Sequence, residues 1–292
     1  MIEILKPTFS GSYELIDCGG FEKLERFGKY ILTRPEPQAI WDKSLSVQEW
    51  NAMSDAIFQK EKGNPEKGEW LVKDKNLPEK WMMEYKTALL DLNFKISLSS
   101  FKHVGVFPEQ AANWDFIAQK SAQYLPKELK VLNLFAYTGA ASLAAKQSNA
   151  DVCHVDSIKQ VISWAKENME LSKLDNIRWI VEDAMKFVKR EARRGNKYQG
   201  IILDPPAYGR GPDGERWILE ENLNEMLKLC AEILDTKPAF FIINLYSMGF
   251  SALILENLIK NCFPQHQNFE IGELYLEDRF NKKLPLGVFC RF

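Results

Sequence analysis

The chain has 292 residues, of which 46% are hydrophobic and 27% are charged, a composition typical of a globular protein with one large domain or a large and a small one. Its 38 lysines and arginines against 40 aspartates and glutamates give a net charge of -2. This balance excludes a protein that holds nucleic acid by a broad basic surface alone, so any polyanion must meet a local patch.

The cysteines and histidines form neither a metal-binding nor a disulfide pattern. The five cysteines are an odd number without a C-x-x-C pair, and His103, His154 and His266 are far apart in sequence. We therefore expect no metal and reduced cysteines in a cytoplasmic protein. The start, MIEILKPTFSG, lacks the apolar region of a signal peptide, and no stretch reaches the roughly 18 apolar residues of a membrane span, so we expect no membrane contact.

Residues 1–95 consist of short apolar runs separated by turn formers, which predicts a small β-rich α+β domain. Within it, residues 30–33 are typical of a strand, and the stretch from Ser46 to Lys60 predicts one helix. Substrate recognition is the role that we assign to this domain as a hypothesis.

Residues 96–292 form the second predicted domain, in which strands alternate with helices from about residue 108 onward. This alternation predicts an α/β fold with a doubly wound, mostly parallel sheet. The predicted strands cover residues 131–136, 152–156, 177–181, 200–204 and 239–245, and the predicted helices cover residues 142–146, 158–171, 184–194 and 220–234. Residues 269–292 predict a terminal antiparallel hairpin.

Several strand ends carry residues suited to binding a nucleotide-like ligand. The first strand of this domain ends in a loop of small residues around Gly139, where backbone N–H groups can meet a ligand at a helix N-terminus. Asp156, Asp183 and Asp204 lie at the ends of the next three strands. Ligands of open α/β sheets bind outside the carboxyl ends of the strands, so these acids are expected to converge on one crevice. A single such acid is more often a helix N-cap.

The ordered strings VLNLFAYTGAASLAA, HVD, VEDA and DPPAYGRG resemble the class I S-adenosylmethionine-dependent methyltransferases. They are most similar to the bacterial large-subunit ribosomal RNA methyltransferase family, from about Phe101 to the C-terminus. Residues 1–95 resemble the small domain that precedes the catalytic domain in that family. The resemblance implies a Rossmann-like domain, S-adenosylmethionine as cofactor and RNA, specifically ribosomal RNA, as substrate.

The resemblance also implies the residues of the cofactor site. The loop after the first strand would cradle the methionine part, Asp156 would hold the ribose hydroxyls, and Asp183 would accept from the adenine amino group. The implied cofactor residues are Glu109, Gln110, Asn133, Phe135, Ala136, Tyr137, Thr138, Gly139, Asp156, Ser157, Asp183, Ala184 and Asp204. Three positions depart from the family: Tyr137 and Ala140 stand where glycine is common, and Asn133 where an acid is frequent.

A predicted catalytic turn is formed by Asp204, Pro205, Pro206 and Tyr208. The two prolines hold the backbone rigid, so that Asp204 can accept from a nucleophilic N–H, and Tyr208 can stack on a flipped base. The alternative is a proline turn with a surface tyrosine.

The acceptor atom is expected to be a nitrogen. Methylation of pyrimidine carbon 5 needs a cysteine thiolate, and relatives with that chemistry carry it just after the Asp-Pro turn or just after the fifth strand. This chain has Ala207 at the first place and Asn244, Leu245, Tyr246 and Ser247 at the second.

Residues 186–197 carry six basic side chains and are the candidate for polyanion contact, although a solvated helix face is the commoner explanation for such a run. We expect residues 209–217 to form a flexible loop that closes over the substrate.

Three other functions stay open. A methyltransferase for a protein or a small molecule would use the same cofactor loop. A catalytically retired methyltransferase fold could bind RNA or a ribosomal protein as a scaffold, which the altered glycines would explain. A dehydrogenase fits less well, because the three-glycine fingerprint is missing.

Overall fold

The computed structural model describes residues 2–61, 64–125, 127–236, 239–246 and 249–292. It divides the chain into two compact units. The sheet unit consists of Met1–Leu5, Ala112–Leu274 and Gly287–Phe292, and the N-terminal unit consists of Lys6–Ala111 and Tyr275–Leu286. The predicted domains 1–95 and 96–292, and the role of the first in substrate recognition, stay predictions.

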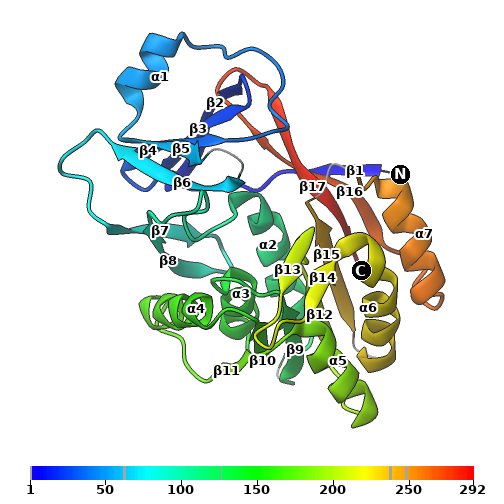
Figure 1. The fold of residues 1–292 in the computed structure, drawn as a ribbon. Coiled ribbons are helices and arrows are strands. Elements are labelled where there is room, and N and C mark those ends of the chain that lie inside the picture. Colours follow the sequence, from blue (N-terminus) through cyan, green and yellow to red (C-terminus); the bar gives the residue numbers. More distant parts are fainter. Residues whose placement is uncertain (1, 62–63, 126, 237–238, 247–248) are drawn as a thin grey trace. The chain divides into compact units, whose positions relative to one another are not determined.

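An eight-stranded sheet with the order β1-β16-β17-β15-β12-β9-β10-β11 is the framework of the sheet unit (Figure 1). Its strands are β1 Ile2–Leu5, β9 Leu129–Leu134, β10 Ala150–Asp156, β11 Arg178–Val181, β12 Gly200–Leu203, β15 Phe240–Leu245, β16 Glu270–Glu277 and β17 Lys283–Arg291. Strands β15, β12, β9, β10 and β11 pair in parallel, whereas β17 runs antiparallel to β15. This mixed, mostly parallel sheet confirms the predicted fold class.

Helices flank the sheet. They are α2 Ala111–Ala122, α3 Ala140–Gln147, α4 Lys159–Leu171, α5 Ala184–Arg193, α6 Leu219–Ile233 and α7 Ala252–Cys262. The sequence predicts α3 to α6, which follow the parallel strands, but not α2 or α7. Helices α3 and α4 contact β10, and Figure 1 shows them on the opposite side of the sheet from α5 and α6. The sheet is therefore wound on both faces.

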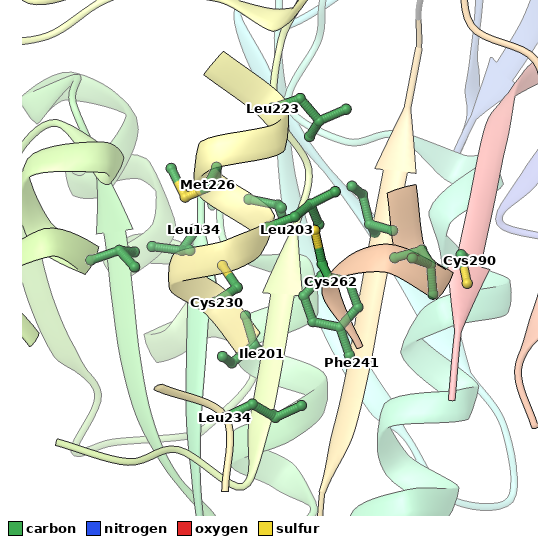
Figure 2. Close-up of a cluster of buried hydrophobic side chains, with 14 of the residues drawn as sticks. Leu134, Ile201, Leu203, Leu223, Met226, Cys230, Leu234, Phe241, Cys262 and Cys290 are labelled. Atoms are coloured by element: carbon green, nitrogen blue, oxygen red, sulfur yellow. The ribbon is translucent and has the colours of Figure 1, made fainter. Parts of the chain in front are cut away.

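A buried cluster joins the sheet to α5, α6 and α7. Figure 2 shows its centre, where Leu134, Ile201, Leu203 and Phe241 from the strands meet Met226 and its neighbours on α6. All six residues of β15 are buried, which is the pattern of a central strand covered on both faces. This core holds the strand ends of the sheet in fixed positions.

The prediction of a flexible loop at residues 209–217 is wrong. The chain forms a short antiparallel hairpin of β13 Tyr208–Arg210 and β14 Arg216–Ile218. Gly214, with φ of +92°, lies in its turn, and Trp217 is only 2% exposed. Burial of this tryptophan anchors β14. The glycines and charged residues of the segment are typical of a loop, so the sequence alone does not indicate this tertiary contact.

The N-terminal unit contains a five-stranded sheet with the order β2-β3-β4-β5-β6 and a separate hairpin of β7 and β8. Their bounds are β2 Tyr13–Gly19, β3 Glu22–Phe27, β4 Tyr30–Pro35, β5 Ala56–Glu61, β6 Asn64–Val72, β7 Lys80–Lys86 and β8 Asp91–Ser97. The β-rich character predicted for this part of the chain agrees with these elements.

The helix predicted from Ser46 to Lys60 is too long. Helix α1 covers Val47–Met53 and begins with a capping box between Ser46 and Glu49. It stops because Ala56 pairs with β4 and because Phe58 is buried on β5, with its ring against Trp70 at 5.2 Å. Tertiary pairing therefore overrides the helical pattern after Met53.

Among the helices of the described residues, none is both long and apolar enough to cross a membrane. In that same part of the chain, the His, Cys, Asp and Glu side chains form no group of three or more that could hold a metal ion.

Candidate functional site

The loop between β9 and α3 has an unusual backbone course. Phe135, Tyr137 and Gly139 have φ values of +54°, +48° and +90°, in the left-handed region that glycine adopts most readily. Tyr137 thus takes the conformation for which glycine is suited, at the position where the sequence resemblance leads us to expect glycine. A left-handed backbone at a non-glycine residue costs roughly 1–2 kcal/mol, so other contacts must hold this loop.

The Asp156 carboxylate, at the end of β10, is one of these contacts. Its Oδ2 accepts from the backbone N–H of Tyr137 at 2.9 Å, and its Oδ1 accepts from the N–H of Ile158 at 2.9 Å. Burial raises the pKa of Asp156, and these backbone N–H groups oppose that rise. Because each carboxylate oxygen has two lone pairs, the same group can accept further hydrogen bonds from a ligand. The neighbouring Ser157 is half-buried.

Asn168 on α4 is a second support of the loop. This fully buried side chain donates from Nδ2 to the Thr138 carbonyl at 3.0 Å. The N–H of Gly139 donates to the Ala136 carbonyl at 3.0 Å. Sequence reasoning missed Asn168, although a polar residue on the apolar face of α4, three residues after Ala165, is a signal for such a role.

Gly139 fits where a larger residue would be crowded, because a Cβ there would lie 3.1 Å from the Ala165 Cβ. We expect Gly139→Ala to lower the free energy of unfolding by about 1–3 kcal/mol and to weaken binding of the cofactor that the sequence resemblance implies. Gly195→Ala is the matched control, since Gly195 has φ of +68° with no atom within 4 Å of its Cβ position. Urea unfolding and calorimetry of both variants test this; equal losses would contradict a special role for Gly139.

A buried polar chain lies under the start of α3. Asn133 donates from Nδ2 to the Ser142 hydroxyl at 2.9 Å, and that hydroxyl lies 3.0 Å from Nδ1 of His154. Burial lowers the pKa of His154 to about 3, so the imidazole is neutral at ordinary pH. Asn133 is 2% exposed and supports the first turn of α3; a direct contact with the cofactor stays a prediction.

Asp183 is the N-cap of α5, which is the more common role for a single acid at a strand end. Its Oδ1 accepts from the backbone N–H of Lys186 at 2.8 Å. Asp183 and Ala184 are both buried. Capping uses one oxygen of the carboxylate, so a contact of Asp183 with the adenine amino group is compatible with it and stays a prediction.

The Asp204-Pro205-Pro206 turn follows β12, whose neighbour in the sheet is β9. Pro205 is buried, and Tyr208 is 52% exposed with its hydroxyl accepting from Nε of Arg210 at 3.1 Å. Because β12, β9, β10 and β11 are adjacent and parallel, Asp204, the loop after β9, Asp156 and Asp183 lie along one edge of the sheet. The three acids thus end adjacent parallel strands, and their convergence on one crevice stays a prediction.

Trp217 on β14 belongs to this region and was missed from the sequence. Its Nε1 donates to the Pro206 carbonyl at 2.7 Å, and its ring centroid lies 4.8 Å from that of Phe135. No sequence pattern in residues 209–217 marks this tryptophan, because its role depends on the hairpin.

Glu109 and Gln110 belong to the N-terminal unit, where the 3-10 helix Pro108–Gln110 carries them. Glu109 is 6% exposed. Burial raises its pKa to about 7, and the positive charges of Lys23 and Arg34 oppose the rise. Contact of Glu109 and Gln110 with the cofactor stays a prediction.

The raised pKa of Glu109 has a consequence for stability. Its folded pKa of about 7 exceeds the ordinary 4.5, so its favourable contribution is complete below pH 4.5 and is lost as the pH rises to about 7. Glu109→Gln stays neutral and should be more stable than the parent above pH 7, by about 1–3 kcal/mol, with the difference vanishing near pH 4.5. Chemical unfolding from pH 4.5 to 8 measures it, with exposed Glu84→Gln as control. A difference independent of pH would contradict the assignment.

Ion pairs occupy much of the basic stretch on α5. Lys186 pairs with Asp213 at 2.8 Å and with Glu215 at 3.2 Å, and Lys189 pairs with Glu225 at 2.8 Å. A groove of about 780 Å³ runs beside these residues, between α5, α6 and the hairpin, and its lining mixes both signs of charge. With the pairs of Arg190 with Glu182 and of Arg194 with Glu191, ion pairs neutralise part of this helix face, and both explanations of the stretch stay open.

Comparison with known proteins assigns the family. A family model described as "Conserved hypothetical protein 95" matches residues 110–228. The solved SAM-dependent methyltransferase from Agrobacterium tumefaciens is 37% identical with a TM-score of 0.90, over 99% of this chain and 93% of that one. The chain belongs to the S-adenosylmethionine-dependent methyltransferases. The resemblance stated from its sequence motifs is confirmed, and S-adenosylmethionine is the cofactor of this methyltransferase.

More distant relatives share parts of the methyltransferase. The ribosomal RNA large subunit methyltransferase K/L of Shewanella frigidimarina is 32% identical over 194 residues, 62% of this chain and 26% of that protein. The protein of the same name from Colwellia psychrerythraea is 33% identical over 118 residues. The chain thus spans about a quarter or less of the length of these relatives. SMU.776, solved in complex with SAH, has a TM-score of 0.72 at 19% identity, over 96% of this chain and 75% of that one, a likeness of fold.

The chemistry of the group at the end of β10 fits this cofactor. The Asp156 carboxylate, held by the N–H groups of Tyr137 and Ile158, offers further acceptor positions suited to ribose hydroxyls. The individual residue roles in cofactor binding stay predictions.

Proposed function

We propose that this methyltransferase methylates a nitrogen of an RNA base, in ribosomal RNA, in the cytoplasm. The observation that carries the proposal is the rigid Asp204-Pro205-Pro206 turn beside the loop after β9, with the exposed ring of Tyr208 next to it. The names of the curated relatives support ribosomal RNA as the substrate class.

S-adenosylmethionine supplies an electrophilic methyl group on a sulfonium centre. In the proposed reaction Asp204 accepts a hydrogen bond from the N–H of the attacking nitrogen and so orients its lone pair. The two prolines fix the backbone of the turn, and Tyr208 stacks on the base. Alignment and exclusion of water are the main tasks of the protein in such an in-line transfer.

The state of the cysteines supports a nitrogen over pyrimidine carbon 5. All five are buried free thiols, and Cys230, Cys262 and Cys290 lie in the core cluster of Figure 2. Burial raises the pKa of Cys153 and Cys290 to about 12, so that they are protonated thiols rather than thiolate nucleophiles. Ala207 follows the turn; of residues 244–247, Ser247 lies outside the described residues.

The structure bears differently on the two alternatives, a protein or small-molecule substrate and a non-catalytic scaffold. The ion pairs on α5 favour a protein or small-molecule substrate, because they leave this face with little net positive charge. The retired scaffold is disfavoured, since Tyr137 adopts the backbone conformation of the glycine that it replaces.

The substrate class is tested with radiolabelled cofactor and three fractions from a strain that lacks the gene: total RNA, total protein and small metabolites. The proposal expects label in RNA. Label in protein or metabolites alone would support the corresponding alternative, and no label in any fraction would support the scaffold.

A further inference from the structure

The Trp217 side chain joins the catalytic turn to the cofactor loop. It donates from Nε1 to the Pro206 carbonyl at 2.7 Å. Its ring packs on Phe135, with centroids 4.8 Å apart and planes inclined by 56°. At 2% exposure the indole is shielded from water. Its hydrogen bond to the Pro206 carbonyl is therefore stronger than an exposed one.

The hairpin brings Trp217 to the turn. Gly209 pairs with Trp217 across the two strands, and a Cβ on Gly209 would lie 3.5 Å from Cγ of Pro206. The N–H of Leu219 donates to the Ala207 carbonyl at 3.0 Å, which closes the base of the hairpin. The hairpin therefore folds back onto the Asp-Pro-Pro turn.

The composition of the turn explains why this contact matters. Neither Pro205 nor Pro206 has a backbone N–H, so their carbonyls are the main-chain groups by which these two residues can be hydrogen-bonded. The partner ring, Phe135, has the left-handed φ of +54° that a non-glycine residue keeps only when its surroundings hold it.

We propose that Trp217 is a positioning residue for methyl transfer. Its N–H holds the Pro206 carbonyl and thereby the orientation of Asp204, and its ring holds Phe135 and thereby the loop after β9. This inference rests on the proposed function, in which Asp204 orients the acceptor and the loop binds the cofactor.

Two substitutions separate the two contacts. Trp217→Phe keeps an aromatic ring and removes the N–H donor, so we expect kcat to fall about 10- to 100-fold with the affinity for S-adenosylhomocysteine within about twofold of the parent. Trp217→Leu also removes the aromatic ring that packs on Phe135. We expect the same loss of kcat and, besides it, a roughly tenfold lower affinity for S-adenosylhomocysteine.

The matched control is Trp81→Phe. Trp81 is 8% exposed and likewise donates from its indole N–H to a backbone carbonyl, that of Phe27 at 2.9 Å, in the N-terminal unit. It should lose thermal stability to a similar extent and keep kcat.

Radiolabel transfer to RNA and calorimetry with S-adenosylhomocysteine measure these effects. The inference is overturned if Trp217→Phe keeps kcat within twofold, if Trp81→Phe loses kcat equally, or if Trp217→Leu keeps its cofactor affinity. If the proposed function itself is wrong, the parent protein labels no RNA. In that case the affinity of Trp217→Leu for S-adenosylhomocysteine, measured by calorimetry, still supports or overturns the inference.

Discussion

Asp204→Ala should lose methyl transfer almost completely and lose a much smaller factor in affinity for its cofactor. The proposed role of the carboxylate is to orient the attacking nitrogen and accept from its N–H, and positioned groups of this kind contribute about 10²–10⁴-fold to rate. Asp204 follows β12 in a turn that two prolines stiffen, so truncation of its side chain leaves the backbone of the turn in place. Single-turnover labelling of RNA measures the loss of rate, and calorimetry measures the retained affinity for S-adenosylhomocysteine.

Asp175→Ala is the control for this variant, because Asp175 is exposed and lies in the connection between α4 and β11. It should methylate RNA at the parent rate. An Asp204→Ala protein that keeps more than a tenth of the parent rate would remove Asp204 from the catalytic step.

Asp156→Ala should have its main effect on cofactor binding. The substitution removes an acceptor proposed for the ribose hydroxyls and also the group that accepts from the N–H of Tyr137 and of Ile158. Loss of a charge-assisted acceptor of this type costs about 1.5–3 kcal/mol, so a loss of about 10- to 150-fold in affinity is expected.

The matched control lies on the same strand. Asp151 is exposed near the beginning of β10, whereas Asp156 ends it, so Asp151→Ala should bind S-adenosylhomocysteine like the parent. Unchanged affinity of Asp156→Ala would mean that the ribose site lies elsewhere.

Much of the sheet unit could be predicted because its signals are local. Its central strands are continuous apolar runs, such as the fully buried residues of β15, and helical segments separate them. The five predicted strands and four predicted helices of this region are present with ends within two residues of those expected. Since the carboxyl ends of parallel strands share one edge, the grouping of Asp156, Asp183 and Asp204 followed from their strand-end positions.

The features that could not be predicted depend on distant parts of the chain. Strand β1 pairs with β16, which lies more than 260 residues later, and its four residues carry no signal for that partner. The β13–β14 hairpin depends on burial of Trp217, and the early end of α1 depends on pairing of β5 with β4. In each case a tertiary contact outweighs the local pattern.

The departures from the family motif have a physical reading. Tyr137 accepts a left-handed backbone at a cost of roughly 1–2 kcal/mol. The hydrogen bonds from the Tyr137 N–H to Asp156 and from Asn168 to the Thr138 carbonyl are of the size needed to offset it. The loop geometry thus persists without the glycine.

The identity of the nucleoside labelled in RNA tests the central proposal most directly. Undermodified total RNA is incubated with the protein and radiolabelled S-adenosylmethionine, digested to nucleosides and separated. The label should be found in a base methylated on nitrogen and should disappear with Asp204→Ala. Label in 5-methylcytosine, or in a nucleoside methylated on its ribose, would contradict the proposed role of the Asp-Pro-Pro turn.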